Sequence, residues 1–161
     1  MFPSRNIYFT EGSTFGTPGA IAIIGILRNW ARTYNAWLTI IDDKGQPNAG
    51  PHACSPTCIV LNTATKTLLY RYDYYMYGQF MRFIQRDAVR INSTRFRSRR
   101  FGNVAFLNPD DTIALVIANA DRDASTFTVT WRNKSFSAEV PGRATATFVW
   151  PTRDSGHPDG E

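Results

Sequence analysis

Glu11 is the side chain whose position in the sequence most suggests chemistry. Ile7–Thr10 is apolar, β-branched or aromatic, which predicts a short buried strand, and Glu11 follows it directly before Gly12 and Ser13 break the strand. Ligands and catalytic side chains gather at the carboxyl ends of strands in parallel α/β sheets and barrels. The sequence therefore predicts either a functional carboxylate at such an edge or a glutamate that faces solvent or caps the next helix.

The elements after Glu11 predict how this carboxylate is positioned. Thr17 followed by Pro18 is a good helix start, a hydroxyl N-cap and then proline, and an apolar face at helical spacing runs from Ala20 to Tyr34. A second buried strand, Ala36–Ile41, ends in the turn 42–45. We expect a βαβ unit with parallel strands and a right-handed crossover, so that both strands end at one edge.

The segment 69–84 is rich in aromatic residues and predicts another helix, with Asp73 as a plausible cap. Its side chains could form a stacking platform or pack on a sheet. One helical face is formed by Tyr77, Phe80, Met81 and Ile84, and the spacing favours a core position for Phe80, Phe83 and Ile84.

From Ala88 onward the hydrophobic period changes to two. Short strands are predicted at 104–107, 112–118, 126–131, 136–140 and 144–150, separated by turn sequences. We interpret them as an antiparallel sheet with one wet face, most simply a β-sandwich. The predicted fold class is α/β plus all-β, with an α/β unit at 1–86, a sandwich at 87–151 and a disordered tail at 152–161.

The composition excludes some classes of protein. The chain has 161 residues, 43% of them hydrophobic, which indicates a globular protein.

Most of its net charge of +5 comes from Arg95–Arg100. This run could be a nucleic-acid patch, but we favour a solvated linker between two packed units, and we expect no nucleic-acid partner. No apolar stretch is long enough to span a membrane, and we expect no signal peptide at Met1–Arg5.

Cys54 and Cys58 lie four residues apart, near His52. A small loop disulfide is the favoured interpretation, ahead of a metal site, which wants four ligands at tighter spacing, and of two free thiols. We expect no metal and no cofactor. The sequons at Asn92 and Asn133 are compatible with secretion, although two such matches are close to chance in a chain rich in Ser and Thr.

Five segments, taken together and in order, resemble the C-terminal part of glycoside hydrolase family 30, whose best-known members are the glucosylceramidases. The matching segments are 9–11, 37–48, 75–84, 104–110 and 140–150. The resemblance implies that Ile7–Thr10 and Ala36–Ile41 are the seventh and eighth strands of a (β/α)8 barrel that is incomplete here. A β-sandwich would follow. The chain departs from glucosylceramidases at Leu38, where these usually carry a polar residue, and in the insertion that carries Cys54 and Cys58.

The resemblance also implies roles for residues. Glu11 falls on the catalytic nucleophile, Trp37 on an aromatic residue lining the sugar site, and Asn48 on a turn near the same edge. Ser13, on the same edge, is a further candidate for substrate binding. A retaining glycosidase needs a second carboxyl group as acid/base. The family's acid/base lies upstream of the segments matched here, and Asp42 and Asp43 are poor substitutes for it.

The implied function is hydrolysis of a β-glucoside or glycosphingolipid by a parent enzyme that is extracellular or lysosomal. The chain by itself is expected to be inactive, because the acid/base would lie in a missing N-terminal half. Within the family, a β-1,6-glucanase or a xylanase is also possible. The alternative of another class is a non-catalytic module that binds carbohydrate or protein.

Overall fold

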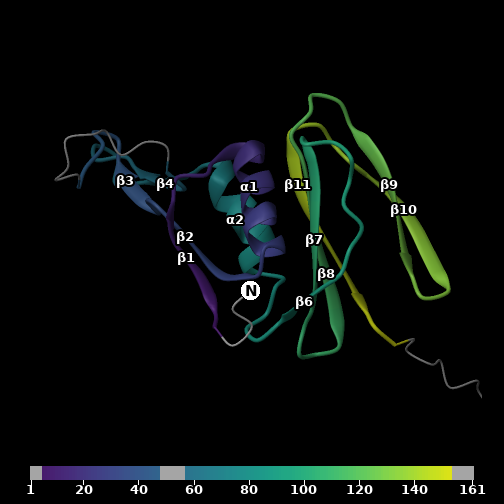
Figure 1. Ribbon diagram of the computed structural model, residues 1–161. Coiled ribbons are helices and arrows are strands. Elements are labelled where there is room, and N and C mark those ends of the chain that lie inside the picture. Colours follow the sequence, from purple (N-terminus) through teal and green to yellow (C-terminus); the bar gives the residue numbers. More distant parts are fainter. Residues whose placement is uncertain (1–4, 48–56, 154–161) are drawn as a thin grey trace, which may run out of the picture.

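The computed structural model describes residues 5–47 and 57–153 (Figure 1). Asn48, His52 and Cys54 lie outside these residues. Neither described helix is long and apolar enough to cross a membrane. The strands are β1 (Ile7–Gly12), β2 (Ala31–Ala36), β3 (Ile40–Asp42), β4 (Ile59–Leu61), β5 (Leu68–Tyr70), β6 (Val89–Ile91), β7 (Phe101–Leu107), β8 (Thr112–Asn119), β9 (Ser125–Trp131), β10 (Lys134–Val140) and β11 (Ala144–Pro151), and the helices are α1 (Gly16–Arg28) and α2 (Tyr72–Met81).

The elements are arranged in layers. The two helices lie between the β1–β2 pair and a four-stranded sheet, and the β9–β10 hairpin covers the far side of that sheet (Figure 1). The order within the four-stranded sheet is β11-β8-β7-β6, and every neighbouring pair in it is antiparallel. A small three-stranded sheet has the order β3-β4-β5.

The predicted βαβ unit is confirmed, because β1 and β2, which precede and follow α1 in the sequence, pair in parallel. Its boundaries differ from the prediction. The helix ends at Arg28, since Trp30 adopts a left-handed backbone with φ of 71°, a conformation that commonly terminates helices. Tyr34, predicted in the helix, therefore lies in β2.

The second strand of the unit is Ala31–Ala36, so the predicted bounds of this strand, Ala36–Ile41, are wrong. Ile40 and Ile41 belong instead to β3, which pairs in parallel with β4 in the small sheet. The described residues form no closed barrel, and the predicted barrel remains a hypothesis for the parent protein.

Both faces of the four-stranded sheet are covered, which corrects the prediction of one wet face. Seven of the eight residues of β8 are buried. On one face the helices contribute Ala20, Ile23, Met76 and Phe80 to a core shared with β7 and β8. On the other face, Phe127 of β9 and Val140 of β10 close a second core. The solvent-facing alternation that the sequence shows belongs to the β9–β10 hairpin.

The predicted strands of the second half are confirmed, and β6 was missed because it is only three residues long. The boundary predicted at residue 87 stays a prediction. Phe80 is buried in α2 as predicted, but Phe83 and Ile84, also predicted in the core, lie beyond the end of the helix and are only half-buried. On the predicted helical face Tyr77 is buried, whereas Met81 is 81% exposed and Met76 takes the core position instead.

The Arg95–Arg100 segment is not a linker between separately packed units. It connects β6 to β7, two neighbours in one sheet. Phe96 packs on Phe101 with 4.5 Å between ring centroids, and the Arg100 side chain pairs with Asp121 at 2.9 Å. This run is therefore part of the sheet's own packing.

Arg28, the last residue of α1, fastens the helix to this loop. Its guanidinium donates to the Ser93 hydroxyl at 2.8 Å, to the Ser93 carbonyl at 2.6 Å and to the Asn103 carbonyl at 2.9 Å. Burial lowers the pKa of Arg28, as do the charges of Arg95 and Arg90. The group nevertheless stays a cation at neutral pH, because a guanidinium does not lose its proton in a folded protein. One side chain thus joins the βαβ unit to the four-stranded sheet.

We predict that Arg28→Met lowers the free energy of unfolding by about 2 kcal/mol or more, because partly buried acceptors lose a charged donor. Urea unfolding followed by circular dichroism measures this. Arg32→Met is the matched control. Arg32 is exposed, and among the described residues its side chain bonds to exposed Asn6, so a change of no more than about 0.5 kcal/mol is expected. Equal losses in both variants would contradict the role of Arg28.

Candidate functional site

Glu11 lies next to the last residue of β1, at the carboxyl edge of the parallel β1–β2 pair, as predicted. The strand itself is not buried as predicted, because Ile7 and Tyr8 are 53% and 56% exposed. The strand is irregular there. Between paired positions, β1 advances three residues from Phe9 to Gly12 while β2 advances only two from Tyr34 to Ala36. A bulge of this kind redirects side chains and is frequent beside active sites. Glu11 falls within the bulge and is exposed to solvent.

Trp37 reaches the same edge from β2. It follows the last residue of that strand, and its backbone N–H donates to the carbonyl of Gly12 at 2.9 Å. Its side chain is 52% exposed. The structure thus brings the backbone of Trp37 against the residue that follows Glu11, and an exposed carboxylate and an exposed indole share one edge.

A stack of three aromatic rings, those of Phe9, Tyr34 and Tyr77, packs next to this edge. The rings of Phe9 and Tyr34 lie parallel, with centroids 5.2 Å apart and planes 8° apart, and Tyr34 stacks in turn on Tyr77. A Cβ atom on Gly12 would lie 2.5 Å from the Tyr34 hydroxyl oxygen and 2.8 Å from Phe9. The position next to Glu11 therefore requires glycine for close approach.

The loop after Glu11 is held by two of these tyrosines. The Tyr34 hydroxyl bonds to both the N–H and the hydroxyl of Thr14, and the Tyr77 hydroxyl donates to the Thr14 carbonyl at 2.6 Å. Burial raises the pKa of Tyr77, which keeps its hydroxyl protonated and able to donate. Ser13, the predicted substrate-binding residue, lies exposed in this fixed loop.

Asp73 caps a helix, but not the one predicted. The buried Asp73 carboxylate accepts from the N–H of Gly16 at 2.6 Å, at the start of α1, while its own helix has Arg71 at the N-cap. A carboxylate satisfies a free N–H and suits the helix dipole there. Thr17 is correspondingly not the N-cap of α1; that position is Phe15, which makes no side-chain capping bond.

Asp42 and Asp43 both accept hydrogen bonds, Asp42 within its own turn and Asp43 from Thr63. The Asp42 carboxylate accepts from the N–H of Lys44 and of Gln46, and Asp43 accepts from the Thr63 hydroxyl at 2.9 Å. That bond lowers the pKa of Asp43. Both carboxyl groups are thus held as hydrogen-bond acceptors, and the lowered pKa of Asp43 disfavours its protonated form, so neither suits the acid/base role.

Cys58 is buried and belongs to the core that the helices share with the four-stranded sheet. Burial raises the pKa of its thiol, as does the charge of Asp73. Because Cys54 lies outside the described residues, the disulfide stays a prediction. The described residues contain no group of three potential metal ligands. Asn48 lies outside the described residues, so its predicted place near the carboxyl edge stays a prediction.

No local pattern in the sequence indicates that Tyr34, Tyr77 and Asp73 support this edge. Tyr34 was assigned to the helix, and the contacts of Tyr77 and Asp73 with the loop span more than fifty residues. Gly12 carried the clearest signal, since glycine directly after a strand indicates a backbone that something approaches closely.

Fold and site together define an α/β unit with a carboxylate and an indole on its carboxyl edge, joined to a β-sandwich. Residues 87–148 match the model of the glycosyl hydrolase family 30 beta sandwich domain. The comparisons therefore support the predicted resemblance to the C-terminal part of glycoside hydrolase family 30, but not to its glucosylceramidases in particular.

The similarity to known proteins extends beyond the sandwich to most of the chain. This chain is 30% identical over 137 residues to an endo-1,6-beta-D-glucanase of Aspergillus fumigatus, covering 80% of this chain and 28% of that protein. An endo-1,6-beta-D-glucanase of Trichoderma harzianum is 30% identical over 162 residues, covering 93% and 32%. A solved endo-beta1,6-glucanase has the same fold, with a TM-score of 0.81 at 23% identity over 93% of this chain and 36% of that one. The chain spans about a third of the length of these relatives.

We predict that Gly12→Ala destabilises the protein by about 1–3 kcal/mol, because the added methyl group must displace the Phe9–Tyr34 stack. Gly25→Ala is the control, and it is expected to raise the free energy of unfolding instead of lowering it. A Cβ atom there meets nothing within 4 Å, and alanine favours the helix interior by about 1 kcal/mol. Thermal and urea unfolding of both variants distinguish the two. A stabilised Gly12→Ala protein would show that this edge is not tightly packed.

Proposed function

We propose that this chain carries the nucleophile of a retaining β-glycosidase, and that the nucleophile is Glu11. The observation that supports this most is the exposed carboxylate in a bulge at the carboxyl edge of a parallel strand pair, next to an exposed indole. An exposed position suits a nucleophile, which must be ionised when it attacks.

The proposed reaction has two steps. An oxygen of the Glu11 carboxylate attacks the anomeric carbon, the glycosidic C–O bond breaks, and an acid protonates the departing oxygen. The same acid, now a base, takes a proton from water, whose oxygen displaces Glu11 and restores the carboxylate. The two inversions give net retention. The two carboxyl groups must lie about 5 Å apart.

The acid/base is proposed to come from outside this sequence. The only other glutamates are Glu139, which lies in β10 of the hairpin layer, and Glu161. Asp42 and Asp43 are held as acceptors. The polypeptide alone is accordingly proposed to hydrolyse no unactivated glycoside, because nothing here protonates the leaving oxygen.

Trp37 is proposed to bind the sugar. The C–H groups on one face of a pyranose ring carry partial positive charge, and the face of an indole is negative, so the two stack favourably. Ser13, on the fixed loop, can offer a hydrogen bond to a sugar hydroxyl.

For the substrate we propose a β-1,6-glucan, in preference to the glucosylceramide that the sequence first suggested or a xylan. The support is that both curated relatives described above are named endo-1,6-beta-D-glucanases. A polysaccharide does not cross membranes, so an extracellular place of action is proposed with it.

The nucleophile can be tested without the missing acid. A 2-deoxy-2-fluoro-β-glucoside with a dinitrophenolate leaving group needs no protonation, so the first step proceeds while the second is slow. We predict covalent labelling of Glu11, detected by intact mass and peptide mapping. Glu11→Gln should remove the label and Glu139→Gln should retain it. Labelling that survives Glu11→Gln, or no labelling at millimolar reagent, would contradict the proposal.

A further inference from the structure

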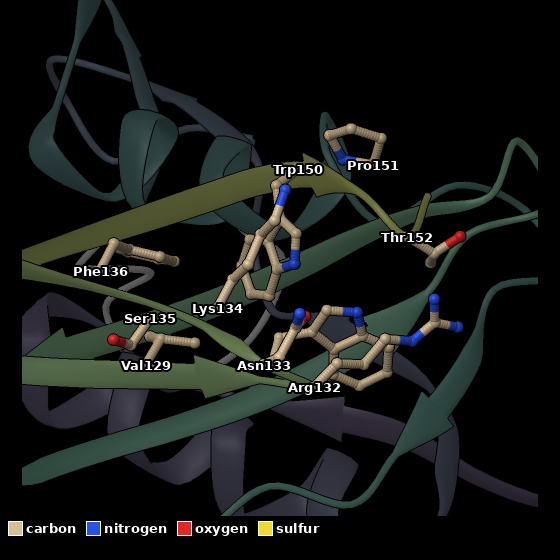
Figure 2. A pocket seen from close by; sticks show the side chains of 10 residues that line it. Val129, Arg132, Asn133, Lys134, Ser135, Phe136, Trp150, Pro151 and Thr152 are labelled. Atoms are coloured by element: carbon tan, nitrogen blue, oxygen red, sulfur yellow. The ribbon is translucent and has the colours of Figure 1, made fainter. Parts of the chain in front are cut away.

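A pocket of about 320 Å³ lies at the end of the β9–β10 hairpin, where the last residues of β11 pass it (Figure 2). This size is at the lower end of the range for small-ligand sites and holds about one or two sugar rings. The helices and the four-stranded sheet separate the hairpin from β1 and β2 (Figure 1). The pocket is therefore distinct from the edge that carries Glu11.

Aromatic rings from three strands line this pocket: Trp131, Phe136 and Trp150. Phe136 and Trp150 meet edge to face, with centroids 5.6 Å apart, so their positions are mutually fixed. In the view of Figure 2, the Trp150 indole lies between Phe136 on one side and Arg132 on the other. The pocket thus offers ring surfaces that are already ordered before a ligand arrives.

Hydrogen-bonding groups surround these rings. Arg132, Asn133 and Ser135 lie in the lining, and the Arg132 guanidinium lies 5.7 Å from the centre of the Trp131 ring. The indole N–H of Trp131 is buried and has no hydrogen-bond partner among the described residues. A buried donor left unpaired costs free energy, and a ligand hydroxyl is a suitable acceptor for it.

Among the described residues, the lining contains no carboxylate. These lining side chains offer no counter-charge to a metal ion or a cationic ligand, whereas a neutral polyhydroxyl ligand needs none. Flat apolar rings ringed by amide, hydroxyl and guanidinium groups match a pyranose, which has apolar C–H faces and hydroxyls around its edge.

We propose that this pocket is a second carbohydrate site, which binds a segment of the same β-glucan that the Glu11 edge is proposed to cleave. The inference rests on the proposed function for the identity of the glycan, and on the pocket's own chemistry for the sugar ring. A polymer held at two separated points dissociates less readily than one held at a single point.

Asn133 opens a sequon at the tip of the hairpin and also lines the pocket. A glycan attached to Asn133 is therefore a second source of the same chemistry. Protein produced in a host without N-glycosylation removes this source and tests the free ligand alone.

The experiment uses the four tryptophans as separate reporters. The side-chain N–H signals of Trp30, Trp37, Trp131 and Trp150 are assigned in ¹⁵N-labelled protein by Trp→Phe substitutions, and a β-1,6-linked glucose oligosaccharide is titrated in. We expect the Trp131 and Trp150 signals to move with one shared Kd while Trp30 does not. An α-1,6-linked oligosaccharide of equal length serves as the ligand control.

Arg132→Asn and Phe136→Leu should each weaken this Kd about fivefold or more, because each removes one contacting group while keeping the hairpin. Arg132 has φ of 55°, a conformation that asparagine tolerates. Arg143→Asn is the matched control. Arg143 lies in the turn between β10 and β11, with φ of 56° and outside the pocket, so the same change of charge should leave the Kd within about twofold.

Each outcome decides one of the two sites. Movement of Trp131 and Trp150 without Trp37 supports the pocket and counts against the proposed edge. Movement of Trp37 alone overturns the pocket and leaves the Glu11 proposal standing. No movement of Trp131 or Trp150, equal binding by the Arg132 variant, or ordering of these rings only in protein glycosylated at Asn133 would also overturn the pocket as a site for free glucan.

Discussion

The packing of α1 between two β layers is the constraint on which the rest of the structure depends. Two parallel strands cannot be joined by a tight turn, so β1 and β2 need a crossover, and α1 supplies it. The face of α1 that carries Ala20, Ile23 and Ile24 packs with Val104 and Val116 of the four-stranded sheet. A Cβ atom on Gly102 would lie 3.1 Å from the Ile21 side chain, so the contact leaves little free space. Because one helix serves both purposes, the edge that carries Glu11 is fixed relative to the sandwich.

The constraint extends to the edge through the start of α1. Thr14 and Phe15 lead from Glu11 into the helix, and a Cβ atom on Gly19 would lie only 2.6 Å from the Thr14 backbone. Tyr77 and Asp73, both from α2, bond to this short connection at Thr14 and Gly16. The second helix thus secures the loop that follows Glu11, although neither Tyr77 nor Asp73 belongs to the edge. Precise placement of a reacting group by residues that do not react is what a preorganised site requires.

The predictions from sequence succeeded where the signal is local. Regular alternation such as Thr126–Trp131, bounded by turn residues, located the strands of the second half, and the strand–helix–strand order gave the βαβ unit. The predictions failed where the same hydrophobic residues fit both a helix and a strand. Leu27, Trp30, Ala31 and Tyr34 fit a helical face, and only the left-handed backbone at Trp30, which hydrophobicity does not reveal, divides them between helix and strand. The roles of Arg28 and Asp73 depend on partners more than fifty residues away, and the pocket at Trp131 exists only when three strands converge. One sequence cannot show such pairings.

The geometry of β1 also limits where a second carboxyl group can come from. Trp37 occupies the side of Glu11 that faces β2, since its backbone bonds to Gly12 there. The opposite edge of β1 has no strand partner among the described residues. Adjacent strands lie about 4.8 Å apart, close to the roughly 5 Å that retention requires between carboxyl groups. A strand or loop that approaches this free side, with its own carboxyl end on the same edge, could therefore present the acid/base at the needed distance.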